Sequence, residues 1–124
     1  RAAEIFAHIT DGRYDKVLLS RDFSLSAEPA GDPVGRSVRL LSQGAADQLY
    51  LAVRLAICDM VLPADKQVPL ILDDALVSFD DDRLHAALDY LLAESRNRQI
   101  LLFACQKREM AYLQGRENVT VMEL

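Results

Sequence analysis

The feature that most constrains the fold is a short apolar run, Val68–Leu72, which stops abruptly at two adjacent aspartates, Asp73 and Asp74. A parallel strand that is buried on both faces has this continuous apolar character. Helical and strand-like segments alternate around it, which favours an α/β fold with a mainly parallel sheet flanked by helices. Helices are expected at about 43–61, Asp80–Ser95 and Lys107–Leu113, and further strands at Gln99–Ala104 and Val119–Met122.

The N-terminal third of the chain follows a different pattern. Residues 1–12 have a helical pattern that stops near Gly12. Because the first residue is Arg1 rather than Met, we interpret them as the end of a helix or coiled-coil arm of a longer protein. Alternating apolar and polar residues then predict a small antiparallel β meander. Its strands are expected at Tyr14–Leu19, Asp22–Ala27 and Arg36–Leu40, so residues 13–124 form the globular unit.

The composition excludes several classes of protein. The chain has 124 residues, of which 51% are hydrophobic, so it is neither disordered nor a disulfide framework. No apolar run approaches the ~18 residues of a membrane span, and we expect a cytoplasmic protein with no membrane partner. The net charge of −5 gives no sign of a polyanion binder. Cys58 and Cys105 lie in apolar segments without metal-ligand spacing and are expected to be reduced core residues.

Polar features that could carry chemistry are expected to meet at the carboxyl ends of the parallel strands. The first is Ser42-Gln43-Gly44, at the start of the helix expected over 43–61. A helix N-terminus offers free N–H groups and a partial positive charge, which suit a phosphate. From these residues alone, however, Ser42 is better explained as an N-cap worth about 1 kcal/mol.

The second feature is the aspartate pair itself. Adjacent side chains at a strand end point to opposite sides, so Asp73 and Asp74 are expected to have different roles. One could hold Mg²⁺, which prefers oxygen ligands, and the other could orient a water for attack on a phosphoryl group. We favour metal binding over a pair of solvated carboxylates, because the strand before them is so apolar. A third feature, Ser78-Phe79-Asp80, opens the next helix, where capping explains Asp80 adequately.

The order and spacing of these motifs resemble the C-terminal lobe of ABC-type ATPase heads. The likeness is closest to the SMC superfamily (structural maintenance of chromosomes), including its double-strand-break-repair ATPases. The run Asp47–Ala56 is most similar to bacterial SMC-like repair ATPases of the YhaN type. The resemblance covers roughly residues 11–124 and implies part of a P-loop NTPase fold.

The resemblance also implies roles for individual residues. Ser42 and Gly44 match the signature motif, which contacts the γ-phosphate of ATP bound to the opposite head. Gln43 replaces the first glycine of the usual signature pair, and Ala45 replaces a polar residue. Arg54, on the same helix, matches a basic residue thought to couple the nucleotide to the coiled coils.

Asp73 matches the Walker B aspartate on Mg²⁺, and Asp74 takes the place of the catalytic glutamate. Because aspartate is one methylene shorter, and a displacement of about 1 Å can cost roughly 10²-fold in rate, we expect slow hydrolysis. Ser78, Phe79 and Asp80 match the D-loop, which crosses the dimer interface, and Gln106 falls near the switch histidine, with Cys105 as the neighbouring alternative.

One absence sets the limits of the fragment. No G-x-x-x-x-G-K-[ST] motif occurs in the chain, so the Walker A lobe is missing and must be supplied from elsewhere. The implied cofactors are ATP and Mg²⁺. The implied partners are the N-terminal Walker A lobe of the same protein, a second ATPase head, DNA and a nuclease, with a role in DNA repair or chromosome maintenance. The fragment alone is expected to be inactive.

Two other functions remain open on the residues alone. The chain could be a free-standing Mg²⁺-dependent phosphohydrolase or phosphate-binding α/β domain, with Asp73 and Asp74 as its whole site. It could instead be a non-enzymatic interaction domain, whose acidic residues only cap helices and solvate the surface.

Overall fold

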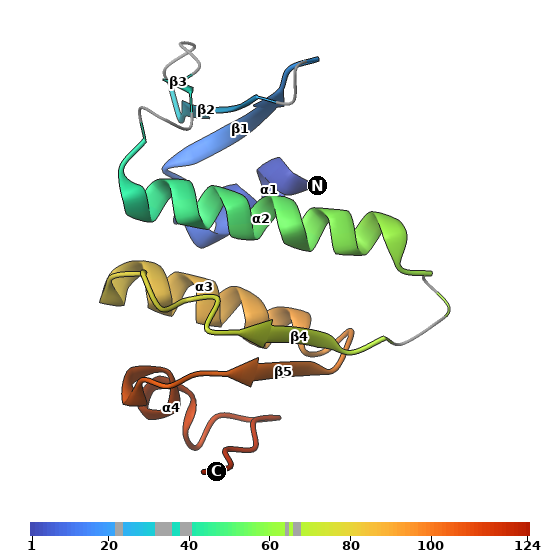
Figure 1. The fold of residues 1–124 in the computed structure, drawn as a ribbon, viewed down its shortest axis with the longest axis vertical. Coiled ribbons are helices and arrows are strands. Elements are labelled where there is room, and N and C mark those ends of the chain that lie inside the picture. The colour runs from blue at the N-terminus through green and yellow to red at the C-terminus, as the bar shows by residue number, and fades with distance from the viewer. Residues whose placement is uncertain (22–23, 32–35, 38–40, 64, 66–67) are drawn as a thin grey trace.

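A computed structural model describes residues 1–21, 24–31, 36–37, 41–63, 65 and 68–124 of the chain (Figure 1). The elements follow in the order α1 (Ala2–Ile9), β1 (Tyr14–Leu19), β2 (Leu25–Pro29), β3 (Arg36–Ser37), α2 (Gln43–Val61), β4 (Leu70–Asp73), α3 (Asp81–Glu94), β5 (Ile100–Phe103) and α4 (Lys107–Leu113). Within these described ranges, no helix combines the length and the apolar character that crossing a membrane requires.

The strands form two separate sheets. β1, β2 and β3 make the predicted antiparallel meander, although β2 begins later and ends later than the expected Asp22–Ala27. Residues 22–23 and 38–40 of the expected strands lie outside the described residues. β4 and β5 pair in parallel, with Leu72 opposite Leu102, and α3 connects them. The α/β class is therefore confirmed, and in the described residues the parallel sheet consists of this one pair.

The strand expected at Val119–Met122 is wrong. Val119 donates its N–H to the carbonyl of Arg116 in a turn, and Val121 and Met122 are 40% and 77% exposed. A strand is stabilised by ladder hydrogen bonds to a neighbouring edge, and no strand of the described structure pairs with this segment. The strand-like pattern in the sequence therefore does not form a strand in the described structure, because no neighbouring strand pairs with it.

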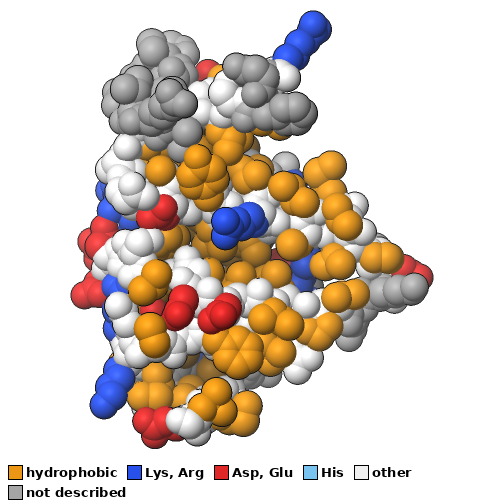
Figure 2. Space-filling model, in the orientation of Figure 1, with side chains coloured by type: hydrophobic (Ala, Val, Ile, Leu, Met, Phe, Trp, Pro, Cys, Tyr) orange, Lys and Arg blue, Asp and Glu red, His pale blue; other side chains and the backbone are white. Residues whose placement is uncertain are grey.

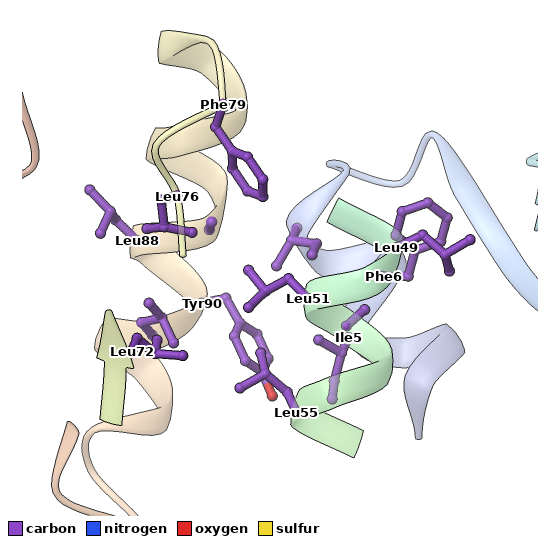
Figure 3. Close-up of a cluster of buried hydrophobic side chains, with 14 of the residues drawn as sticks. Ile5, Phe6, Leu49, Leu51, Leu55, Leu72, Leu76, Phe79, Leu88 and Tyr90 are labelled. Atoms are coloured by element: carbon purple, nitrogen blue, oxygen red, sulfur yellow. The ribbon is translucent and has the colours of Figure 1, made fainter. Parts of the chain in front are cut away.

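The core forms on both sides of α2. Phe6 of α1 lies beside Leu49 on one side of the helix, whereas Leu51 and Leu55 lie on the side of Tyr90 and Leu72 (Figure 3). Apolar residues at helical spacing over 43–61 predict one buried stripe, which includes Ile57 and Met60, yet these two side chains are 52% and 83% exposed. That part of the prediction is wrong, because both residues lie near the C-terminal end of α2, where Ile57 lines the groove between α2 and β4 and not the core.

β4 is buried on one face only. Leu70 and Leu72 are buried, whereas Ile71 between them is 62% exposed. The expectation of a strand covered on both faces is therefore wrong for this chain. Apolar surface is thus left open beside the parallel pair.

The expectation that both cysteines are reduced core residues is wrong in part. Both are free thiols, but Cys58 is half-buried and Cys105 is exposed.

An ion-pair cluster joins the start of α1, the end of α2 and the end of α3. Asp59 accepts from Arg1 Nε at 2.7 Å and from the Arg98 guanidinium, and Arg98 Nε also bonds Glu94 at 3.0 Å. Burial would raise the pKa of the Asp59 carboxyl, but the hydrogen bonds from Arg1 and Arg98 outweigh it and hold this pKa below its usual value. The carboxylate therefore stabilises the fold only while it is ionised.

We predict that Asp59→Asn lowers the unfolding free energy by about 1 kcal/mol at neutral pH. Because the pKa of Asp59 is lowered by folding, its contribution is complete above the unfolded pKa and is lost as the pH falls through the folded pKa. Urea unfolding at pH 7 and at about pH 2 should therefore show a smaller difference at the lower pH. Asp15→Asn, at an exposed position of β1, is the control. An equal loss at both pH values would contradict the assignment.

Candidate functional site

The N-terminal tip of α2 carries the predicted signature residues. Ser42 is the N-cap of α2, and its Oγ accepts a hydrogen bond from the backbone N–H of Ala45 at 3.2 Å. Ser42 and Gln43 are exposed at this tip. The capping role that the sequence predicted for Ser42 is confirmed. The free N–H groups of the first turn of α2 lie at the same tip of the helix.

Arg83, on the first turns of α3, is the residue that the sequence reasoning missed. Its Nη2 donates to Ser42 Oγ at 3.3 Å, its Nε donates to Gln48 Oε1 at 3.1 Å, and its Nη1 bonds the carboxylate of Asp80. One guanidinium thus connects the tip of α2 to the start of α3. An arginine just after an acidic helix start would ordinarily be taken for a solvated residue, so nothing local in the sequence identified it.

Gly44 makes room for that guanidinium. A Cβ at this position would lie 2.9 Å from Arg83 Nε and 3.0 Å from its Cδ and Cζ. The sequence argument assigned Gly44 to the close approach of an anion, and the structure adds a second reason for glycine, which is the packing of Arg83 across it.

The loop between β4 and α3, residues 74–80, is tied to α2 by hydrogen bonds. Ser78 Oγ donates to Asp47 Oδ2 at 2.7 Å, and Gln43 Nε2 donates to Asp47 Oδ1 at 3.0 Å. Asp80 is the N-cap of α3 and accepts from the backbone N–H of Arg83 at 2.9 Å. That hydrogen bond, with the side-chain bond from the same arginine, lowers the pKa of the Asp80 carboxyl.

The same loop is held from its other side by α4. Arg108 Nη2 donates to the carbonyls of Leu76 and Val77, each at 3.1 Å, and Nη1 donates to the carbonyl of Phe79. Phe79 itself is 2% exposed and anchors the loop in the core. The segment predicted as a D-loop therefore has a fixed backbone between the arginines of two helices.

The predicted Walker B residues lie at the carboxyl end of β4. Asp73 is exposed, and within the described residues its carboxylate has no hydrogen bond or ion pair. Asp74 has φ of 49°, a left-handed conformation that aspartate and asparagine adopt more readily than most residues. Its Oδ1 accepts from the backbone N–H of Cys105 at 3.3 Å, across the ends of β4 and β5.

A hydrogen bond to Asp74 also raises the pKa of the Cys105 thiol, and the negative charge of Asp74 adds to this effect. Gln106, the N-cap of α4, is exposed and makes no side-chain capping bond. The structure thus brings Asp74 together with Cys105 and places Gln106 next in the chain. Which of the two occupies the switch position stays a prediction.

The donor set at Asp73 fits one ligand of a magnesium ion. Mg²⁺ in phosphoryl-transfer sites is typically held by one or two carboxylates together with substrate phosphates and water. An exposed, unpaired carboxylate meets that requirement. The described residues contain no group of three or more His, Cys, Asp or Glu side chains that could hold a metal by themselves. The remaining ligands would therefore come from a nucleotide and from solvent.

The signature residues at the start of α2 and the aspartates at the end of β4 lie at one end of the molecule. In Figure 1, α2 begins at the same end at which β4 finishes and α3 begins. Asp47, Asp73, Asp74 and Ser78 line a groove of about 610 Å³ between α2 and β4. The groove also includes Arg54, and hydrophobic side chains gather around the hollow over α2 and β4 in Figure 2. Asp73, Asp74 and Ser78 thus share one groove with Asp47 of α2, and the tip of α2 that carries Ser42 lies at the same end of the molecule.

The bond between Asp74 and Cys105 gives a direct test of the arrangement at the ends of β4 and β5. We predict that Asp74→Asn lowers the pKa of the Cys105 thiol, because it removes the charged acceptor that raises it. The rate of Cys105 alkylation at pH 8, followed by peptide mass spectrometry, should rise. Asp73→Asn, one residue away, is the matched control and should leave the rate nearly unchanged. Equal effects of the two variants would show that the carboxylate of Asp74 does not face Cys105.

Comparison with known proteins identifies one relative by sequence. The chain is 35% identical over 107 residues to the uncharacterized protein YhaN of Bacillus subtilis (strain 168). The match covers 86% of this chain but only 11% of the length of YhaN. No model of a protein family matches the chain.

Solved SMC heads share the fold. A structure from work on the ATP-driven dimerization and DNA-stimulated activation of SMC ATPases superposes with a TM-score of 0.73 at 20% identity, covering 95% of this chain and 76% of that one. The Smc head of Pyrococcus furiosus bound to the C-terminal domain of ScpA gives a TM-score of 0.64 at 19% identity, covering 90% of this chain and 28% of that one.

At these identities the structural matches show the fold, and the sequence match to YhaN shows the relationship. Both agree with the resemblance that the order of the motifs indicated. The chain is therefore a homologue of YhaN with the fold of a segment of an SMC-like ATPase head.

Proposed function

We propose that residues 13–124 form the C-terminal lobe of an ATPase head that binds and hydrolyses ATP at a composite site between two heads. One observation carries the proposal. Asp73 and Asp74 are exposed at the end of β4, at the end of the molecule where α2 begins, and Ser78 in the loop that joins β4 to α3 is bonded to Asp47 of α2. Carboxylates beside an anion-binding helix start suit a phosphoryl-transfer reaction.

The residues at the ends of β4 and β5 have separate roles in this proposal. Asp74 acts as the general base that takes a proton from the attacking water, and Gln106 donates a hydrogen bond to the phosphate. Asp73 would hold Mg²⁺, and the ion would supply charge neutralisation at the phosphate oxygens. The left-handed φ of 49° at Asp74 suits an aspartate, and this backbone conformation accounts for the shorter side chain at the position of the family's glutamate.

The signature residues act on the nucleotide of the second head. Ser42, Gln43 and Gly44 present a hydroxyl and the free backbone N–H groups of α2 to a phosphate. Asp80 and its loop lie beside them and would contact the second head. Each head would thus contribute its signature tip to one nucleotide and its Asp73–Asp74 pair to another, so that hydrolysis requires two heads.

The open apolar face supports a further lobe of the same protein as partner. Ile57, Ile71 and Val77 are 52%, 62% and 47% exposed around the groove between α2 and β4. Exposed apolar patches of this kind commonly mark interfaces. The chain contains no phosphate-binding P-loop and spans only 11% of YhaN, so a lobe carrying a Walker A motif is the occupant we propose. Arg54, at the same groove, would then lie at the junction of the two lobes.

The wider biological role follows from the relatives. SMC ATPases that share the fold undergo DNA-stimulated activation. On this basis we propose a role in DNA repair or chromosome maintenance, with DNA and a nuclease as partners. Residues 1–12 would be the end of a coiled-coil arm, and α1 packs directly on α2 as such an arm would.

We predict that Asp74→Asn in the full-length protein lowers the rate of ATP hydrolysis by at least about 10²-fold, because an amide cannot accept the proton of the attacking water. Asparagine tolerates the same left-handed backbone, so the fold should be kept. ATP binding should persist, and ATP-bound heads should accumulate as dimers in sedimentation velocity. Ser42→Ala is the companion variant, expected to keep ATP binding by one head but to weaken the dimer.

Hydrolysis by Asp74→Asn at the wild-type rate would remove Asp74 as the base. Hydrolysis of a phosphate ester by this chain alone, dependent on Asp73 and Mg²⁺, would instead favour the free-standing phosphohydrolase.

A further inference from the structure

We infer that Arg83 is a positioning residue that fixes the hydroxyl of Ser42 as a hydrogen-bond donor toward the incoming phosphate, and that Gln48 locks Arg83 in place. The inference rests on the proposed function, because it concerns how the signature serine meets a nucleotide. It assigns a role to two residues that neither the sequence motifs nor the comparisons identify.

The hydrogen bonds of Ser42 determine which group its hydroxyl can still offer to a ligand. A serine hydroxyl has two acceptor lone pairs and one proton to donate. Ser42 Oγ accepts from the N–H of Ala45 at 3.2 Å and from Arg83 Nη2 at 3.3 Å, so both lone pairs are used. In the described part of the chain, no acceptor takes its proton. The proton is therefore directed away from both donors and is free to bond an anionic oxygen.

Without Arg83, the Ser42 hydroxyl would no longer be held with its proton directed toward the ligand. The hydroxyl could then rotate, and it could meet a phosphate or a water with either its proton or its lone pair. The cost of selecting the donor orientation would be taken from the binding energy of the nucleotide. Arg83 makes that selection before the ligand arrives.

Arg83 is itself tightly constrained. Its side chain is 21% exposed, and it bonds both the Asp80 carboxylate and Gln48 Oε1 while it lies across Gly44. Lysine could not replace it, because a single ammonium does not reach several acceptors in one plane as the guanidinium fork does. A side chain held at this many points keeps one rotamer.

Gln48 holds the Arg83 guanidinium in its position over Gly44. It is 2% exposed, and its Nε2 donates to the carbonyl of Ile9, the last residue of α1. This bond fixes the amide so that Oε1 faces Arg83, since the flipped amide would place a donor against the guanidinium and leave both bonds unmade. A displacement of α1 would therefore be transmitted through Gln48 and Arg83 to the hydroxyl of Ser42.

A double-mutant cycle in the full-length protein tests this. The variants Ser42→Ala, Arg83→Ala and the double variant are made in the Asp74→Asn background, and the dissociation constant of the ATP-bound dimer is measured. Each single variant should weaken the dimer by about tenfold, and the effect of the double variant should fall well short of the product of the two, because Arg83 acts mainly through Ser42 and only its bond to Asp80 is independent. ATP binding by isolated heads should stay unchanged, because the signature residues act on the nucleotide of the other head.

Arg96→Ala is the control, an exposed arginine just after α3. Arg83→Lys, which keeps the charge and the aliphatic stem, should weaken the dimer nearly as much as Arg83→Ala, and it replaces that variant if Arg83→Ala does not fold. Additive effects of Ser42→Ala and Arg83→Ala would overturn the inference while leaving the proposed function intact. No effect of Ser42→Ala on the dimer would overturn the proposed function itself.

Discussion

The parallel pairing of β4 with β5 is the constraint on which the site depends. The register that sets Asp73 beside Phe103 brings the two strand ends to one edge, so that the backbone N–H of Cys105 reaches the carboxylate of Asp74. The crossover through α3 requires the chain to turn directly after Asp74, and this turn creates the loop of residues 74–80. Because that loop is bonded to Asp47 of α2 through Ser78 and to Arg108 of α4, the strand pairing also links this edge of the sheet to two helices.

Much of this arrangement could be predicted from the sequence. The apolar run that ends in two aspartates gave the strand end, and the helical pattern after Ser42 gave the cap. These are local signals, since a strand end, an N-cap and a helix start each depend on a few adjacent residues. The same holds for Asp80, which caps α3 as expected.

The rest depends on contacts between distant residues. Arg83 lies 41 positions from Ser42, and nothing in the residues around it distinguishes a bridging arginine from a solvated one. The burial of Ile57 on α2 was misjudged because this residue lines the groove between α2 and β4, which a stripe pattern cannot reveal. The strand expected at 119–122 needs a partner edge, and a sequence pattern contains no information on whether one is present. The sequence patterns that gave wrong predictions are therefore those whose outcome depends on contacts with distant residues.

The central claim is that Ser42 and Asp73 belong to two different nucleotide sites of one dimer. The most direct measurement is a crystal structure of the full-length Asp74→Asn protein with ATP and Mg²⁺. The account predicts that Asp73 lies at the Mg²⁺ of the nucleotide bound by its own head, while the hydroxyl of Ser42 contacts the γ-phosphate of the nucleotide bound by the other head. A structure in which both residues contact one nucleotide, or in which neither approaches a phosphate, would contradict it.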